Sequence, residues 1–262
     1  MTATTILSGE APISHRERPA GLGRLTMVEL RKMADTRSGK WMLGIVALIA
    51  VAVDVIQFFA FDSSDQDFIG IFGVMLYATS ILLPVIGILL VTSEWSQNTA
   101  LITFTLVPGR LRVLGAKLLA GVLLAVGAVV VCALLAALGN MLSSSAGDGQ
   151  GTWNGGHAIL LQALVFQLVG IWMGMGFGIL CMSSPLAIVL YFALPTVWSV
   201  LSGVISALQT PAHWLDTSST LDALVNEGIT GKDWAQVLVS ALVWVAIPLI
   251  AGAVRLHRTE IK

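Results

Sequence analysis

The sequence predicts an all-α integral membrane protein with six transmembrane helices and an N-terminal interfacial amphipathic helix. The composition, the lengths of the apolar runs and the placement of the charges predict this class. Of the 262 residues, 56% are hydrophobic and only 11% are charged, and the mean hydropathy is +0.88. A soluble domain carries about a quarter charged residues, so this chain has too few to cover a water-exposed surface. The composition therefore excludes an ordinary soluble enzyme, a nucleic-acid-binding protein and a disordered regulator.

Six apolar runs are each long enough to cross a bilayer. A spanning helix needs roughly 20 mostly apolar residues, and helices are expected because isolated strands cannot satisfy their backbone in lipid. The fourth and fifth runs share a stretch without Lys, Arg, Asp or Glu, and Ser183-Ser184-Pro185 divides it. Serine before proline is typical of a helix start, with serine as the N-cap and proline at the first helical position. The predicted spans are residues 41–61, 69–92, 118–142, 158–182, 186–208 and 234–254.

The charges orient these spans. Lys and Arg lie before the first span, between the second and third, and after the sixth, and the positive-inside rule places these segments in the cytoplasm. Thirteen of the 14 Lys and Arg residues are then inside, and only Lys232 is outside. Six spans put both termini in the cytoplasm. The outer loops carry Asp62, Asp65, Asp67, Asp148, Asp216, Asp222, Glu227 and Asp233.

Two polar segments are expected to be structured. Residues 1–40 form a cytoplasmic tail before the transmembrane domain, 41–262. Within this tail, Thr26 and Glu29 match a capping box, and apolar residues from Met27 to Ala34 share a helical face. We therefore expect a helix over 27–37 on the inner membrane surface, its basic side near anionic headgroups. A solvated helix without a further role is the alternative. The outer segment 209–233 is predicted to form short amphipathic helices.

The sequence contains no recognised catalytic or metal-binding motif. It lacks a G-x-x-x-x-G-K-[ST] loop, an H-E-x-x-H helix and a G-x-S-x-G elbow. The four histidines are scattered over polar segments on both sides of the membrane, so a shared metal site would need ligands from opposite faces. Cys132 and Cys181 lie at different depths and are interpreted as small buried hydrophobes. We expect no catalytic site, metal or cofactor on this chain.

Asp54 is the one charged residue within the predicted spans. A carboxylate at that depth is costly and usually faces a cavity or a partner group. One interpretation places Asp54 in a translocation path, in contact with substrate or a proton. The other makes it a structural hydrogen-bonding group, or one that reaches the outer interface.

Small residues in the fourth span favour close helix packing. Gly170, Gly174, Gly176 and Gly178 form two overlapping small-xxx-small steps. We expect them to pack within the subunit, and a dimer seam is the alternative. Pro195 predicts a kink in the fifth span, either for gating or as an ordinary kink.

The segment after the second span carries the most specific pattern. A glutamate and an aromatic residue at the membrane exit precede a threonine and a Leu-rich stretch, and a proline turn and three cations follow. This order resembles the cytoplasmic coupling segment of ABC-2 type transporter permeases. The residues that match it are Glu94, Trp95, Thr99, Pro108, Arg110, Arg112 and Lys117.

Both ends of the chain add to the resemblance. The last span, with Leu242-Val243-Trp244 and Pro248, and its basic tail resemble the end of such permeases. The likeness covers nearly the whole chain, and it depends on the order of the motifs together with the six-span count. The residues that resemble the family's interfacial helix are Glu29, Arg31, Lys32 and Arg37.

The resemblance implies a permease subunit of an ABC exporter for a lipid, a peptide or a hydrophobic drug. Such a subunit is a multi-pass protein of a prokaryotic cell membrane, and it forms a homodimer or heterodimer. It sits on separate ATP-binding subunits, which hold ATP and Mg²⁺ and push the coupling segment. We expect Glu94 to pair with a cation such as Arg110 or Arg112, or to cap the loop. The alternatives are a solvated loop and, for the whole protein, a self-sufficient secondary transporter, a channel or a membrane scaffold.

Overall fold

The computed structural model describes residues 21–60, 67–96, 109–146, 152–153, 157–226 and 228–258. Every regular element in this part of the chain is helical. The elements are α1 (Leu22–Asp35), α2 (Arg37–Ala60), α3 (Phe68–Ser96), α5 (Arg110–Ala146), α6 (His157–Cys181), α7 (Ser184–Val204), α8 (Ser206–Leu215), α9 (Thr217–Asp222), α10 (Gly231–Ala241), the π-helical segment η2 (Leu242–Ala246) and α11 (Ile247–Arg258).

Within the described ranges, six helices are long and apolar enough to cross a membrane. They are α2, α3, α5, α6, α7 and the continuous helix α10–η2–α11. The prediction of an all-helical, multi-pass membrane protein with six such helices is thus confirmed. The predicted end of the fifth span at residue 208 is wrong, because α7 ends at Val204 and the extended backbone of Ile205 separates it from α8.

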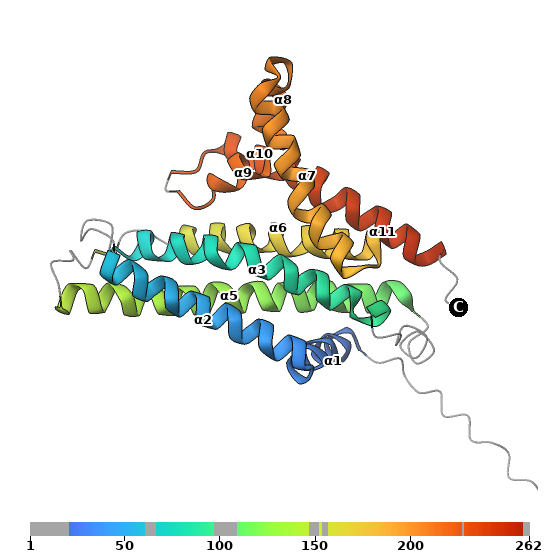
Figure 1. The fold of residues 1–262 in the computed structure, drawn as a ribbon, viewed down its shortest axis with the longest axis horizontal. Helices are drawn as coiled ribbons and strands as arrows, with labels where there is room; N and C mark the ends of the chain where they lie inside the picture. Colours follow the sequence, from blue (N-terminus) through green and yellow to red (C-terminus); the bar gives the residue numbers. More distant parts are fainter. Residues whose placement is uncertain are drawn as a thin grey trace, which may run out of the picture.

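The helices α3, α5 and α6 form the centre of the bundle, with α2 crossing them on one side (Figure 1). Helix α11 packs along α6, whereas α7 and α8 extend away from the central helices (Figure 1). Glycines let α6 approach its neighbours closely. A Cβ atom on Gly174 would lie 2.5 Å from the Pro84 carbonyl oxygen of α3, and one on Gly176 would lie 3.2 Å from Leu249 N of α11. The fourth-span glycines therefore pack within the subunit, as expected.

The first helix begins earlier than the sequence predicted. Helix α1 starts at Leu22 with Gly21 as its N-cap, so Thr26 lies inside the helix. Its Oγ1 donates to the Leu22 carbonyl oxygen at 3.0 Å, a hydrogen bond to the preceding turn. The predicted capping box is thus wrong, because the helix already covers the turn that Thr26 was expected to cap. Thr36 separates α1 from α2.

The boundary between α6 and α7 lies where the sequence predicted it. Met182 has a positive φ of 53°, and Ser183 is the N-cap of α7. The predicted cap is one residue off, because Ser184 is already helical and Pro185 is the second residue of the helix rather than the first. The Ser183 side chain makes no capping hydrogen bond. The Oγ atoms of Ser184 and Thr92 lie 2.7 Å apart, which joins this turn to α3.

The last spanning helix widens before Pro248. Proline lacks an N–H and its ring clashes with the carbonyl four residues earlier, here that of Trp244. The π-helical segment η2 lies at this point, and the Ile247 N–H donates to the Leu242 carbonyl. Trp244 Nε1 in turn donates to the Leu215 carbonyl oxygen at 2.6 Å, which fixes the end of α8. Helices α8 and α9 are short, as predicted for the segment that begins at residue 209.

Candidate functional site

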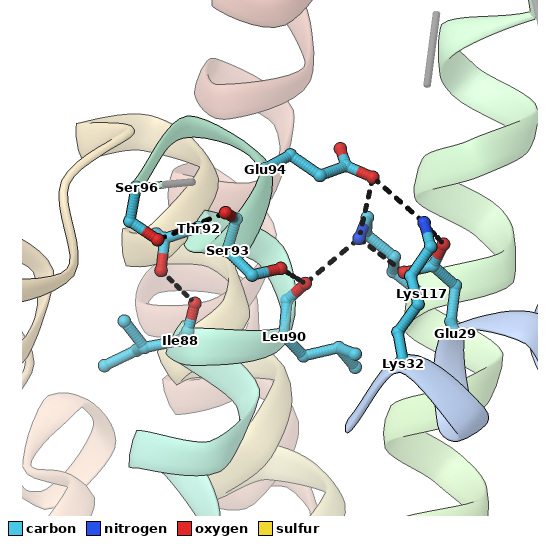
Figure 2. Close-up of polar contacts among 9 residues, drawn as sticks. All are labelled: Glu29, Lys32, Ile88, Leu90, Thr92, Ser93, Glu94, Ser96 and Lys117. Atoms are coloured by element: carbon cyan, nitrogen blue, oxygen red, sulfur yellow. Dashed lines mark hydrogen bonds and ion pairs between the residues drawn. The ribbon is translucent and has the colours of Figure 1, made fainter. Parts of the chain in front are cut away.

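Four charged side chains gather beside the two helix ends that flank residues 97–108 (Figure 2). Glu29 and Lys32 come from α1, Glu94 from the last turn of α3 and Lys117 from the start of α5. We call these four residues the ion cluster. Two acids face two bases, so the group carries no net formal charge.

Lys117 is the centre of the ion cluster. Its ammonium group lies 2.6 Å from Glu29 Oε2 and 3.3 Å from Glu94 Oε1, and it donates to the Leu90 carbonyl oxygen at 3.0 Å. Of the three protons that a lysine ammonium can donate, two go to Glu29 Oε2 and the Leu90 carbonyl oxygen, and Glu94 Oε1 lies within ion-pair distance. Only 4% of the Lys117 side chain is exposed, so these contacts replace its hydration. Removing one partner of such a buried pair typically costs about 3–5 kcal/mol, because a charge is left without compensation.

Lys32 bridges the two carboxylates from the solvent side. Its Nζ donates to Glu29 Oε1 at 2.7 Å and lies 3.6 Å from Glu94 Oε1. With 44% of its side chain exposed, Lys32 keeps part of its hydration. Glu29 thus uses one oxygen for each lysine, and α1 is attached to both α3 and α5.

Glu94 has poorer contacts than Glu29. The residue is 3% exposed, yet neither carboxylate oxygen accepts a hydrogen bond from the described part of the chain. Its contacts with charged side chains in that part of the chain are two ion pairs of Oε1, at 3.3 Å to Lys117 and 3.6 Å to Lys32, both longer than those of Glu29. A cavity of about 10 Å³ lies beside it, with room for about one water molecule. The cavity is also lined by Val91, Trp95, Arg110, Val113, Leu114, Lys117, Ile179 and Leu256.

The electrostatics of α1 follow from these contacts. Burial alone would raise the pKa of Glu29, but Lys117 and Lys32 outweigh it and hold the pKa below its ordinary value of 4.5. Burial alone would lower the pKa of Lys32, but Glu29 and then Glu94 raise it above 10.5. Both residues are therefore charged at neutral pH.

The structure joins two groups of residues that the sequence analysis kept apart. Glu94 and Lys117 come from the predicted coupling segment, and Glu29 and Lys32 come from the predicted interfacial helix. The expectation that Glu94 would pair with Arg110 or Arg112 is wrong, because its ion pairs are with Lys117 and Lys32. The i, i+3 spacing of Glu29 and Lys32 was the one sequence signal for part of this cluster.

The other predicted site residues lie around the cluster or outside the described ranges. Arg110 Nη1 donates to the Leu256 carbonyl oxygen at 2.8 Å and so joins α5 to the end of α11. Trp95 and Arg112 are half-buried, and Arg31 is exposed. The Arg37 side chain, Thr99 and Pro108 lie outside what the structure describes.

Asp54 lies far along α2 from α1 and faces α5. A Cβ atom on Gly139 of α5 would clash with Asp54 Oδ1, so the carboxylate rests against the backbone of that helix. One turn later, the buried Gln57 donates through Nε2 to the Gly70 carbonyl oxygen at 3.4 Å. Asn140, also buried, donates to the Thr152 carbonyl oxygen at 3.3 Å. Polar groups thus accumulate where α2, α3 and α5 meet, and the role of Asp54 in transport stays a prediction.

Within the described ranges, no group of three or more His, Cys, Asp or Glu side chains could hold a metal ion. Comparison of the sequence with protein-family models finds no match, and comparison with curated proteins finds none either. The residues themselves are therefore the basis of the functional proposal.

Proposed function

We propose that this chain is the transmembrane permease subunit of an ATP-driven ABC transporter that exports a lipid, a peptide or a hydrophobic drug. It works in the cell membrane of a prokaryote as half of a permease homodimer or heterodimer. ATP and Mg²⁺ bind to separate ATP-binding subunits, where hydrolysis takes place. This chain contributes the path through the membrane and no catalytic residue.

The observation that carries the proposal is the ion cluster that joins the two helices on either side of residues 97–108 in the sequence. The segment that resembles a coupling segment leaves α3 just after Glu94 and leads into α5, where Lys117 lies two turns in. A segment that receives a push must be firmly joined to the helices that it moves. Glu94 and Lys117 join the two flanking helices to each other and to α1 through ion pairs of 2.6–3.6 Å.

A second junction supports the same assignment. Arg110, the first residue of α5, donates to the Leu256 carbonyl oxygen near the end of the last spanning helix. Arg255 Nη1 donates to the Leu180 carbonyl oxygen at the end of α6. Displacement of the start of α5 would thus reach α11 and α6 through hydrogen bonds as well as through packing.

Co-purification tests the proposal. The full chain, tagged at its C-terminus, is extracted in mild detergent from the cells that make it, and co-eluting proteins are identified by mass spectrometry. We expect an ATP-binding subunit with a Walker-type phosphate loop. We also expect the complex to hydrolyse ATP and, in lipid vesicles, to export a hydrophobic fluorescent substrate only when ATP is supplied.

The matched control replaces the phosphate-loop lysine of the ATP-binding subunit by alanine, which should abolish hydrolysis and transport without loss of assembly. Purification of the chain without an ATPase, together with substrate movement driven by an ion gradient, would contradict the proposal. That result would favour a self-sufficient secondary transporter or channel.

A further inference from the structure

Lys117 contacts two carboxylates, and its contact with Glu29 is shorter than its contact with Glu94. Its ammonium lies 2.6 Å from Glu29 Oε2 and makes a hydrogen bond there, whereas Glu94 Oε1 is 3.3 Å away and accepts no hydrogen bond from any described residue. A buried carboxylate without hydrogen bonds is unfavourable, because its lost hydration is not replaced. In the observed arrangement, this cost falls on Glu94.

A second arrangement of the same charges is open to the chain. If α1 moves away, it removes one acid and one base together, Glu29 and Lys32. Glu94 and Lys117 then remain as a neutral pair, and Lys117 can give Glu94 the hydrogen bond that it lacks. The cavity of about 10 Å³ beside Glu94 and Lys117 gives their side chains room to adjust. Each arrangement is neutral, so neither leaves an uncompensated buried charge.

We propose that Glu29 is a positioning residue for the end of α3 and the start of α5, the two helix ends on either side of residues 97–108, and that Lys117 exchanges between Glu29 and Glu94. With Lys117 on Glu29, α1 is docked against α3 and α5 and holds the end of α3 and the start of α5 in place. With Lys117 on Glu94, α1 is released, while α3 and α5 stay joined to each other. Two discrete packings of this kind are how small displacements become conformational switches.

The role of the segment in this inference rests on the proposed function, but the docking of α1 does not. The tests therefore use the purified full chain in lipid vesicles, without ATP or a transport assay. Failure of the exchange would leave the co-purification result untouched, and absence of an ATPase would leave the exchange intact.

The first test measures a distance between two spin labels. Cys132 and Cys181 are replaced by alanine, and labels are placed at Met27 of α1, which is 53% exposed, and at Ser96, the exposed last residue of α3. The parent should give one narrow distance distribution. Glu29→Gln should add a longer, broader population because α1 loses its attachment to Lys117.

The matched control is Asp35→Asn, which removes an exposed carboxylate from the same helix. It should keep the parent distribution. An unchanged distribution in Glu29→Gln would overturn the positioning role, because α1 would then be docked by its apolar contacts alone.

The second test is a double-mutant cycle on thermal unfolding. Glu29→Gln and Glu94→Gln each leave Lys117 one carboxylate, whereas the double variant leaves it none. The fall in the unfolding midpoint should therefore be larger in the double variant than the sum of the two single falls. If both single variants can be purified and the double variant cannot, the result also supports the exchange. Falls that simply add would overturn the exchange.

Discussion

The ammonium of Lys117 lies 2.6 Å from Oε2 of Glu29, although 88 residues separate the two in the sequence. Their side chains are 4% and 6% exposed, so the pair is buried between α5 and α1. One side of α1 is therefore part of the packed bundle. The residues of α1 that remain exposed include Arg24, Met27, Val28 and Arg31. We therefore expect the position of α1 to depend on the charge of Lys117 and Glu29.

The first prediction concerns pH. The pKa of Glu29 is below 4.5 in the folded chain, so its ionised form stabilises the fold above that pH. This contribution is lost as the pH falls through the folded pKa. The pKa of Lys32 is above 10.5, so its contribution is present below that pH and is lost as the pH rises through the folded value. Thermal unfolding of the purified chain should show the contribution of the cluster intact between about pH 4.5 and 10.5.

The variant Glu29→Gln tests how the thermal unfolding midpoint depends on pH on the acidic side. The variant lacks the group that titrates, so its midpoint should fall less steeply than the parent's as the pH drops below 4.5. If the unfolding midpoints of the two proteins fall equally steeply below pH 4.5, Glu29 does not stabilise the fold through its charge.

The second prediction concerns Glu94. Glu94→Gln keeps the size of the side chain and removes its charge, while Lys117 keeps Glu29. The free energy of unfolding should fall by about 3 kcal/mol, the low end for removing one partner of a buried ion pair. We expect a complex that assembles and hydrolyses ATP but transports poorly, because the end of α3 loses its ion pairs to Lys32 of α1 and Lys117 of α5 and keeps only the Leu90 hydrogen bond to Lys117. ATP hydrolysis and vesicle transport measured on one preparation would show this uncoupling.

Asp35→Asn serves as the control and should leave both activities unchanged. Loss of assembly in Glu94→Gln would instead make the residue a docking contact. Wild-type transport in both Glu94→Gln and Glu94→Ala would contradict the coupling role. The segment after α3 would then be interpreted as a solvated loop.

The sequence predicts the spanning helices because their signal is local. Hydropathy needs only a run of neighbouring residues, and the break at Ser183 follows from a serine and a proline beside each other. The end of α7 was missed because residues 205–208 are as apolar as the helix before them, and only the backbone turn at Ile205 ends it.

The ion cluster could not be predicted because its residues come from three separate helices. Periodicity on one helix finds Glu29 with Lys32 but not the approach of Lys117 from α5. The sequence analysis predicted Arg110 or Arg112 as partners of Glu94 because they are the nearest cations after it in the sequence. Arg110, however, donates to the Leu256 carbonyl oxygen of α11, a contact between residues 146 positions apart.

The third prediction concerns topology. The charge asymmetry predicts that both termini lie inside, so single cysteines at Thr152 and Ser218 should react with a membrane-impermeant maleimide added outside intact cells. Ser218 is chosen because it is exposed, whereas the neighbouring Thr220 is buried. A cysteine at Ser96 is the inside control and should react only after permeabilisation. Reaction of 152 or 218 only from the cytoplasmic side would overturn the assignment.

The fourth prediction concerns Asp54. If its carboxylate lines the translocation path, Asp54→Asn should alter transport while leaving protein level and ATPase binding intact, and Asp54→Glu should restore part of it. Gly139→Ala should act similarly, because the new Cβ would displace the carboxylate. Vesicle transport rates over several substrates provide the measurement. Unchanged kinetics across them would assign Asp54 a structural hydrogen bond.

The fifth prediction compares the same substitution at two glycines in the spanning helices. At Gly174, a Cβ would lie 2.5 Å from the Pro84 carbonyl oxygen, and backbone cannot rotate away as a side chain can. Helices α3 and α6 must then separate, at a cost of about 1–3 kcal/mol, the usual range for overpacking. At Gly127 of α5, nothing lies within 4 Å, so alanine there should gain about 0.5–1 kcal/mol from its better helix propensity. Thermal unfolding should therefore shift down for Gly174→Ala and slightly up for Gly127→Ala. Equal shifts in the two variants would mean that the close α3–α6 approach does not limit stability.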